Sequence, residues 1–209
     1  MRYYQIEGRS LPSVTTILDL TMPLEQRLML EKARIKNPVQ FELKRQEACN
    51  RGNYIHKVVE AAVRGDRLPQ NFNYSKHLQQ LRPFLRAIAG ASFFMNEQQI
   101  HDLEVGYAGT FDLVTELDDC MTLIDIKTAA YQIWPGAKHS ALLQTAAYAA
   151  AWNKQQHALR ANAIAAVFVT PYKLEIYRHE GPEMAAYISE FYQRVKLYGM
   201  RRGEQSVSA

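Results

Sequence analysis

The fold is decided by residues 110–127, which read TFDLVTELDDCMTLIDIK. Two runs rich in β-branched and apolar residues flank Asp118-Asp119, and short acidic residues of this kind favour tight turns. The pattern predicts a β-hairpin, with one strand over residues 100–117 and a return strand over residues 121–128.

This hairpin is expected to bring charged side chains together. Counting back from the turn places Asp112 roughly opposite Asp125. Side chains alternate along a strand, so Asp125 and Lys127 share one face while Ile124 and Ile126 point to the other. Two neighbouring carboxylates repel each other unless a cation lies between them, and Mg²⁺ or Mn²⁺ suits such oxygen ligands. The alternative is a solvent-facing charge pair, which is common in sheets.

Three side chains outside the hairpin are candidates for the same centre. His56 lies on the apolar face of a helix that begins near Asn53. Gln144 and Tyr148 lie four residues apart, on one face of a helix expected over residues 137–156. A lone histidine on such a face is more often a satisfied core residue than a ligand, and a core aromatic is the alternative for Tyr148.

The remaining elements follow from helical and strand periodicity. Further helices are expected over residues 13–20, 24–48 with an interruption at Pro38, 53–65, 74–90 and 182–199, and strands over residues 161–170 and 174–178. Helices followed by a ββαβ(β)α series predict an α/β fold, in which helices flank a mixed β-sheet. Without a linker or repeat, we expect one domain over residues 1–209, with a helical N-terminal elaboration at 1–50, a core at 51–199 and a tail at 200–209.

Composition places the chain among globular proteins. It has 209 residues, of which 47% are hydrophobic and 22% charged. Its longest apolar stretches are too short for a bilayer span, so no membrane partner is expected. The N-terminus lacks a secretory or transit pattern, which predicts the cytoplasm of a bacterium or of a phage-infected cell. Cys49 and Cys120 are too few for a four-cysteine zinc or iron–sulfur site.

Charge varies along the chain. Residues 1–60 carry 10 Lys/Arg against 7 Asp/Glu, residues 61–119 carry 5 against 8, and residues 120–209 carry 10 against 6. Basic segments around an acidic middle suit a protein that binds phosphates at its rim and a metal at its centre, although ordinary surface charge gives the same counts. The phosphate-loop, dinucleotide, HExxH and GxSxG motifs are absent from the sequence, which removes the simplest support for those chemistries.

Four short motifs occur in a fixed order. They are RGNYIH at residues 51–56, GTFD at 109–112, DIK at 125–127 and QTAAY at 144–148. Together they resemble the motif series of the PD-(D/E)XK nuclease superfamily, in its RecB-like exonuclease branch. Residues 11–18, LPSVTTIL, look like the opening of small single-domain members such as mitochondrial genome maintenance exonuclease and its phage or bacterial relatives.

The resemblance implies a restriction-endonuclease-like core and a set of roles. The implied metal ligands are His56, Asp112, Asp125 and the backbone carbonyl of Ile126, with Mg²⁺ as the ion and Mn²⁺ as a substitute. Lys127 is the implied catalytic lysine, which Gln144 and Tyr148 would orient. Glu104 is either a supporting acid behind the ligands or an ordinary charge at a strand end. The iron–sulfur members of the branch carry four cysteines, so no cluster is expected here.

The implied reaction is metal-dependent hydrolysis of phosphodiester bonds in DNA. Basic and aromatic side chains around the first motif suit a single strand, and Lys44, Arg45, Arg51, Tyr54 and Lys57 are the predicted DNA contacts. We therefore expect an exonuclease that prefers single-stranded DNA or DNA ends, and the sequence identifies no protein partner. The alternatives are a structure-selective or restriction-like endonuclease, and a non-catalytic nucleic-acid-binding module on a nuclease scaffold.

Overall fold

A computed structural model describes residues 1–89, 91, 94–155 and 159–207. Its strands are β1 (Tyr3–Ile6), β2 (Arg9–Pro12), β3 (Phe94–Asp102), β4 (Tyr107–Leu117), β5 (Cys120–Thr128), β6 (Ala163–Val169) and β7 (Leu174–Glu180). Its helices are α1 (Val14–Leu20), α2 (Leu24–Lys36), α3 (Pro38–Arg64), the 3₁₀ helix η1 (Phe72–Tyr74), α4 (Ser75–Ala89), α5 (Pro135–Gln155) and α6 (Gly181–Val207). Among the described helices, none combines the length and the apolar character that a bilayer crossing requires.

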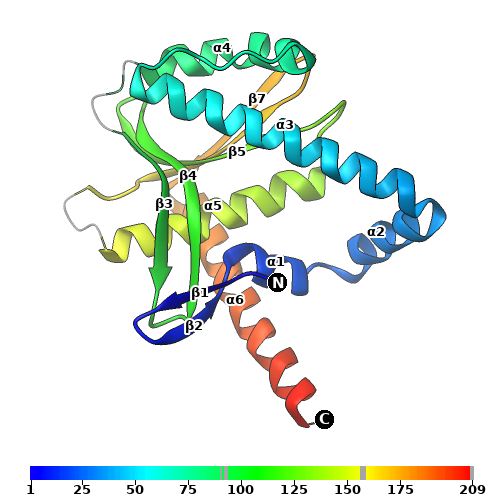
Figure 1. Ribbon diagram of the computed structural model, residues 1–209. Coiled ribbons are helices and arrows are strands. Elements are labelled where there is room, and N and C mark those ends of the chain that lie inside the picture. Colours follow the sequence, from blue (N-terminus) through cyan, green and yellow to red (C-terminus); the bar gives the residue numbers. More distant parts are fainter. Residues whose placement is uncertain (90, 92–93, 156–158, 208–209) are drawn as a thin grey trace.

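A mixed five-stranded sheet forms the middle layer, in the order β3-β4-β5-β6-β7. Only the β5–β6 pair is parallel, while the other neighbouring pairs are antiparallel. Helices α3 and α4 pack on one face of this sheet, and α5 packs on the other together with α1 and α6 (Figure 1). The predicted mixed sheet flanked by helices is confirmed.

The interior strand β6 is covered by helices on both of its faces. All seven of its residues are buried. Ile164, Ala166 and Phe168 belong to the core beneath α5, whereas Ala165 and Val167 belong to the core beneath α3 and α4. A strand buried on both faces is apolar throughout, which accounts for its continuous run of hydrophobic residues.

The β4–β5 hairpin forms as the sequence predicts. Asp118 and Asp119 make its two-residue turn, and both have positive φ, as a tight hairpin of right-handed twist requires. The pairing runs from Leu117–Cys120 to Leu113–Ile124. In this register, Asp112 and Asp125 are the next residues along the two strands.

The structure differs from the sequence expectations in four places. Residues 100–117 form parts of two strands, because Leu103–Gly106 is a turn that pairs β3 with β4. The N-terminal region holds a β1–β2 hairpin besides its helices. Helix α3 continues unbroken through Gly52, where the expected helix boundary would lie, and α6 runs to Val207 instead of ending at residue 199.

Pro38 does end one helix and begin the next. It occupies the first turn of α3, where a missing N–H costs no hydrogen bond, and Asn37 caps that turn by accepting a bond from Gln40 N at 3.0 Å. Helix α2 buries none of its residues, and residues 38–50 of α3 are exposed except for the half-buried Phe41. Figure 1 shows α2 and this first half of α3 projecting beyond the sheet as a helical arm.

Candidate metal-dependent active site

The candidate site lies where β4 and β5 separate. Backbone pairing between these strands ends at Leu113–Ile124. Beyond that point, Asp112 Oδ2 accepts a hydrogen bond from Ile126 N at 2.7 Å, so a carboxylate takes the place of a backbone carbonyl. The divergence therefore holds one acidic side chain between the strands and turns it toward α3.

His56 reaches this point from α3. Its Nε2 lies 3.1 Å from the carbonyl oxygen of Ile126, and its Nδ1 lies 3.1 Å from Glu97 Oε1 and 3.6 Å from Asp112 Oδ1. Burial lowers the pKa of the imidazole, but the hydrogen bond to Glu97 and the charges of Asp112, Glu97 and Asp125 outweigh it and raise that pKa to about 9. Without a metal, His56 is thus held as a cation among acids.

Glu97 is a site residue that the sequence reasoning missed. It lies on β3, where the β3–β4 register places it opposite Asp112. Glu97 has a φ of 50°. This left-handed backbone conformation is costly for a non-glycine residue inside a strand. His56, Glu97 and Asp112 each offer a ligand atom within 4.8 Å of the others. The available signal was the β3–β4 turn, because counting across that turn pairs residue 97 with residue 112.

A chain of polar contacts runs from Asp125 on β5 to helix α5. Lys127 Nζ donates to Asp125 Oδ1 at 2.8 Å and to Gln144 Oε1 at 3.2 Å, and Gln144 Nε2 donates to the hydroxyl of Tyr148 at 3.3 Å. Burial lowers the pKa of the Lys127 ammonium, but the charges of Asp125 and Asp112 outweigh it and raise that pKa. The structure brings Asp125, Lys127, Gln144 and Tyr148 together in one hydrogen-bonded chain.

Gly109 makes room for the last member of this chain. A Cβ at this position would lie 2.4 Å from Tyr148 Cε1 and 3.0 Å from its hydroxyl oxygen. The ring therefore packs directly on the β4 backbone. The glycine of the GTFD motif is explained by this close approach, because its φ is not one that only glycine favours.

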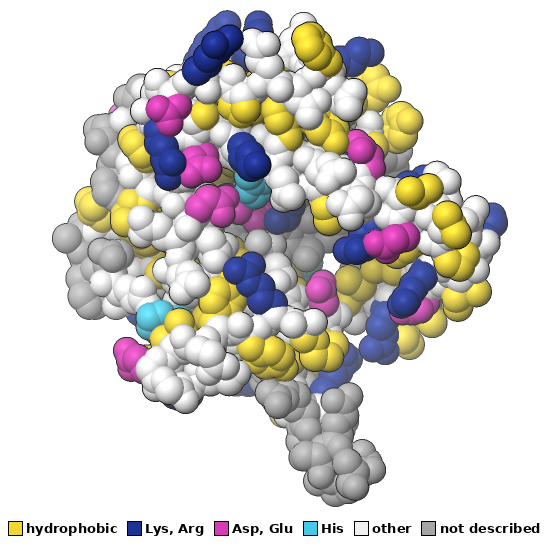
Figure 2. Space-filling model, viewed as in Figure 1, with side chains coloured by type: hydrophobic (Ala, Val, Ile, Leu, Met, Phe, Trp, Pro, Cys, Tyr) yellow, Lys and Arg dark blue, Asp and Glu magenta, His cyan; other side chains and the backbone are white. Residues whose placement is uncertain are grey.

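The residues present fit a divalent cation. Asp125 is fully buried, and its Oδ2 has no hydrogen-bond partner among the described residues. Burial, and then the charge of Asp125, raise the pKa of the Asp112 carboxyl to about 7, so ionisation of Asp112 is disfavoured without a cation. The carboxylates of Glu97 and Asp112 and the imidazole of His56 offer ligand atoms within 4.8 Å of one another, and donors of this kind suit Mg²⁺ or Mn²⁺. The buried Asp125 carboxylate is close enough for its charge to act on both Asp112 and His56. In Figure 2, acidic, basic and histidine side chains gather in the middle of the face shown, beside a hollow next to the arm.

Glu104 does not join this cluster, contrary to one of the two roles expected for it. Its side chain is 84% exposed and pairs with Lys154 Nζ at 2.8 Å, on the turn between β3 and β4. Counting eight residues back from Asp112 crosses that turn, so Glu104 lies beyond the far end of β4. The acid opposite Asp112 comes from β3 instead.

Two of the predicted DNA contacts face the protein interior. Arg51 is 6% exposed and donates from Nε to Thr128 Oγ1 at 3.2 Å. Tyr54 packs in the core against Tyr74 and donates its hydroxyl proton to the carbonyl of Pro69 at 3.0 Å. The other three predicted contacts are exposed on α3: Lys44, Arg45 and Lys57. Of these, Arg45 is paired with Glu42.

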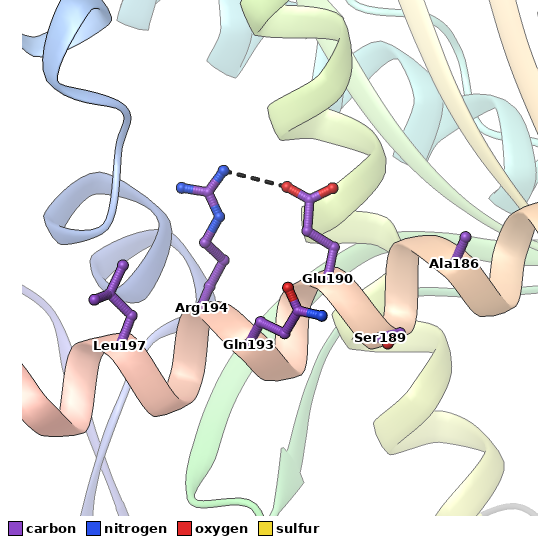
Figure 3. Close-up of a pocket in the computed structure, with 6 residues that line it drawn as sticks. All are labelled: Ala186, Ser189, Glu190, Gln193, Arg194 and Leu197. Carbon is purple, nitrogen blue, oxygen red and sulfur yellow. Dashed lines mark hydrogen bonds and ion pairs between the residues drawn. The ribbon is translucent and has the colours of Figure 1, made fainter.

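A separate hollow of about 560 Å³ lies beside α6, lined by Ala186, Ser189, Glu190, Gln193, Arg194 and Leu197 (Figure 3). Its Glu190–Arg194 ion pair spans 3.2 Å across one helical turn. A charge pair satisfied on its own helix provides no excess charge for a ligand. Among the described residues, the group of acids and histidine that could hold a metal lies at the β4–β5 divergence and shares no residue with this hollow.

The chain is similar in structure to the crystal structure of SSO0001, with 15% identity and a TM-score of 0.47, covering 92% of this chain and 78% of that one. It is also similar to a phage related exonuclease from Haemophilus somnus 129PT, with 12% identity and a TM-score of 0.36, covering 74% of this chain and 83% of that one. No curated protein matched the sequence. The family model described as the PD-(D/E)XK nuclease superfamily matches residues 26–205, which include the whole candidate site, and the chain therefore belongs to that superfamily.

Proposed function

We propose that the protein is a DNA exonuclease of the RecB-like branch, dependent on a divalent metal and acting on single strands or free DNA ends. The observation that carries the proposal is the Asp125 carboxylate. One of its oxygens binds Lys127 Nζ at 2.8 Å, and the other is buried with no partner among the described residues. A buried acceptor without a partner is costly, and a bound cation removes that cost.

The metal is proposed to be held by His56, Glu97, Asp112 and Asp125, with the carbonyl of Ile126 beside them. When bound, Mg²⁺ or Mn²⁺ supplies Lewis-acid activation of water and of the scissile phosphate. Metal binding would require His56 to lose one proton, because only in the neutral ring does one nitrogen have an electron pair free for a metal.

Lys127 is proposed to act on the phosphate. Its ammonium counters the negative charge that grows on the phosphate oxygens as the bond breaks. Gln144 fixes the direction of that ammonium, because its amide oxygen accepts from Lys127 while its amide nitrogen donates to Tyr148. Tyr148 stays protonated, since burial, and then the charge of Asp125, raise the pKa of its hydroxyl.

The helical arm supports a strand as the substrate. It bears exposed cations along residues 27–45, and α3 leads directly from it to His56 and the exposed Lys57. The arm also reaches α5, because a Cβ on Gly136 would lie 2.8 Å from Gln26 Nε2 of α2. Cations on a surface that leads into the site attract the phosphates of DNA whatever its nucleotide sequence.

The test compares linear and covalently closed circular single-stranded DNA, each labelled and incubated with Mg²⁺ or with a chelator. We expect Mg²⁺-dependent release of nucleotides from the linear strand and no loss of the circle. Linearisation of the circle would favour the endonuclease alternative. Binding without cleavage of either substrate would favour a non-catalytic module.

Two variants make the test specific for the site. Asp125→Asn keeps the shape of the side chain and removes the charge that holds the metal, so hydrolysis should be lost. Asp118→Asn makes the same chemical change in the exposed turn of the same hairpin, where asparagine tolerates the left-handed backbone. Equal activities of the two variants would contradict the proposed site.

A further inference from the structure

Large aromatic side chains are exposed immediately beyond the strand that carries Lys127. Residues 129–134 connect β5 to α5 and contain Tyr131 and Trp134, which are 74% and 62% exposed. Tyr172, 65% exposed, lies in the turn between β6 and β7. Single exposed apolar residues are ordinary, but several large rings at the same end of two neighbouring strands indicate a binding surface.

The connecting segment is fixed at both ends. At its start, Ala129 N donates to Val169 O at 3.1 Å, and the Ala129 carbonyl lies 3.1 Å from His77 Nε2. At its end, the Trp134 carbonyl accepts from Ala137 N at 2.9 Å and from Lys138 N at 3.2 Å, which starts helix α5. The rings are therefore presented to solvent by an anchored backbone, which lowers the entropy lost when a ligand binds.

The same contacts place the rings near the catalytic groups. The bond from Ala129 to Val169 brings the segment beside the β6–β7 turn that holds Tyr172. Tyr131 follows Lys127 by four residues, so their Cα atoms are at most about 14 Å apart. Gln144 lies nine residues into α5, about 13 Å along its axis from the start of the helix that follows Trp134.

Charge around the rings identifies the class of ligand. Three segments lie at this end of the sheet: residues 71–78, 129–138 and 170–174. They contain Lys76, Lys138 and Lys173 and no acidic residue. Glu175 of β7 pairs with two of these lysines, at 3.5 Å from Lys138 and 2.6 Å from Lys173. Three lysines against this one carboxylate leave a net positive charge around the rings. Exposed rings beside net positive charge match a polyanion that carries flat apolar groups, which describes an unpaired nucleic-acid strand.

We propose that Tyr131 and Trp134 form a stacking platform for the bases of single-stranded DNA beside the scissile phosphate, with Tyr172 at its border. This proposal rests on the proposed function, since it names the part of the substrate that the same site holds. Paired bases are already stacked on their neighbours, so the platform binds unpaired ones. It contributes to strand affinity without reading sequence, because every base presents a flat face.

The two tryptophans of the chain provide a direct readout. Trp134 is exposed, whereas Trp152 is 2% exposed and its indole N–H donates to the carbonyl of Leu159. The full-length protein is titrated in a chelator with an oligothymidine of about 12 nucleotides, and tryptophan emission is recorded alongside the anisotropy of a labelled strand. Stacking quenches Trp134, so we expect emission to fall in step with binding and to be unchanged by a blunt duplex.

Ring-retaining and ring-removing variants then separate stacking from other contacts. Tyr131→Ala and Trp134→Ala should each weaken binding of the oligothymidine by about five- to a hundredfold, with an unchanged salt dependence. Tyr131→Phe and Trp134→Phe keep a ring and should bind within about twofold of wild type, while Trp134→Phe loses the quenching. Residual emission from the buried Trp152 reports whether each variant is folded.

Two results would overturn the platform: binding of the strand without quenching of Trp134, or folded alanine variants that bind the strand as tightly as wild type does. The titration involves no turnover, so its failure is separate from failure of the nuclease proposal. Cleavage that ignores both rings contradicts only the platform. If the rings are needed for binding but the wild-type protein never cleaves DNA, the proposed function is contradicted and the platform is still supported.

Discussion

Lys127 is held between the carboxylate of Asp125 and the amide of Gln144. We therefore expect it to affect the rate of cleavage more than the affinity for DNA. Lys127→Ala removes a charge that acts mainly as the phosphate becomes more negative, so the single-turnover rate should fall about a hundredfold to a thousandfold. Affinity for uncleavable DNA should change much less. Lys57→Ala is the control, since this exposed lysine should contribute to binding and its salt dependence instead. A normal rate in bound Lys127→Ala would remove the β5 strand from catalysis.

Glu97 is the candidate ligand that the structure adds to those expected from the sequence. Glu97→Gln removes the hydrogen-bonded charge beside His56, so the pKa of the imidazole should fall toward its ordinary value, which an NMR titration of the histidine measures. Metal affinity, measured by calorimetry with Mn²⁺, should fall as well. Glu104→Gln removes an exposed acid beside the turn of the same hairpin and should change neither quantity. Equal Mn²⁺ affinities in the two variants would exclude Glu97 as a ligand.

At this scale, local patterns predicted what strand alternation and the clearly marked turn at Asp118-Asp119 govern, and they missed what the unmarked turn between β3 and β4 governs. Asp125 and Lys127 share a face because they are two residues apart, and the turn at Asp118-Asp119 fixes Asp112 opposite Asp125. Glu97 depends on a second turn, hidden within a run that reads as one strand. Its side chain reaches the site only after that turn reverses the chain.

At the scale of elements, two glycines of the motifs have opposite surroundings. Gly109→Ala should destabilise the protein by about 1–3 kcal/mol and reduce activity, because the new methyl group overlaps the Tyr148 ring packed on β4. Gly52→Ala should stabilise it by about 0.5–1 kcal/mol, since α3 is continuous there and nothing lies within 4 Å of a new Cβ. Urea unfolding measures both changes. Destabilisation by Gly52→Ala would show that the helix is interrupted at this point in solution.

Elements were predictable where the chain itself marks their ends. Pro38 separates two helices, Gly65 ends α3 in a left-handed conformation, and continuous apolar character marks the doubly covered β6. The interior of α3 was misread, because a glycine in a polar stretch suggests a break that packing of the second half of the helix on the sheet overrides. The β1–β2 hairpin has too few residues to show a periodic pattern, and its turn at Glu7-Gly8 lacks the usual Asn or Asp.

At the scale of the molecule, the candidate ligands come from four elements in two layers of the fold: helix α3, and strands β3, β4 and β5 of the sheet. No single element forms the site, so a bound metal links elements that are far apart in sequence. Because such a site does not exist in the unfolded chain, the binding free energy of the metal adds to the free energy of unfolding.

The pKa values of His56 and Asp112 determine how the stability of the metal-free protein changes with pH. The folded pKa of His56 is about 9 against an ordinary 6.5, and that of Asp112 is about 7 against 3.8. Both values are raised, so in the metal-free protein each group stabilises the fold at low pH. That stability is lost as pH rises, between 3.8 and 7 for Asp112 and between 6.5 and 9 for His56.

Metal binding must displace the same protons, so its pH dependence has the opposite sign. The rise in melting temperature caused by a fixed concentration of Mg²⁺ should increase from about pH 6.5 to about pH 8.5, as affinity grows by up to about tenfold per pH unit for each proton displaced. Thermal melts in Mg²⁺ and in chelator at each pH measure this increase. In His56→Ala, loss of the most basic proton should flatten it above about pH 7. An Mg²⁺-induced rise of the same size at both ends of the range would mean that the cation binds outside this cluster of acids.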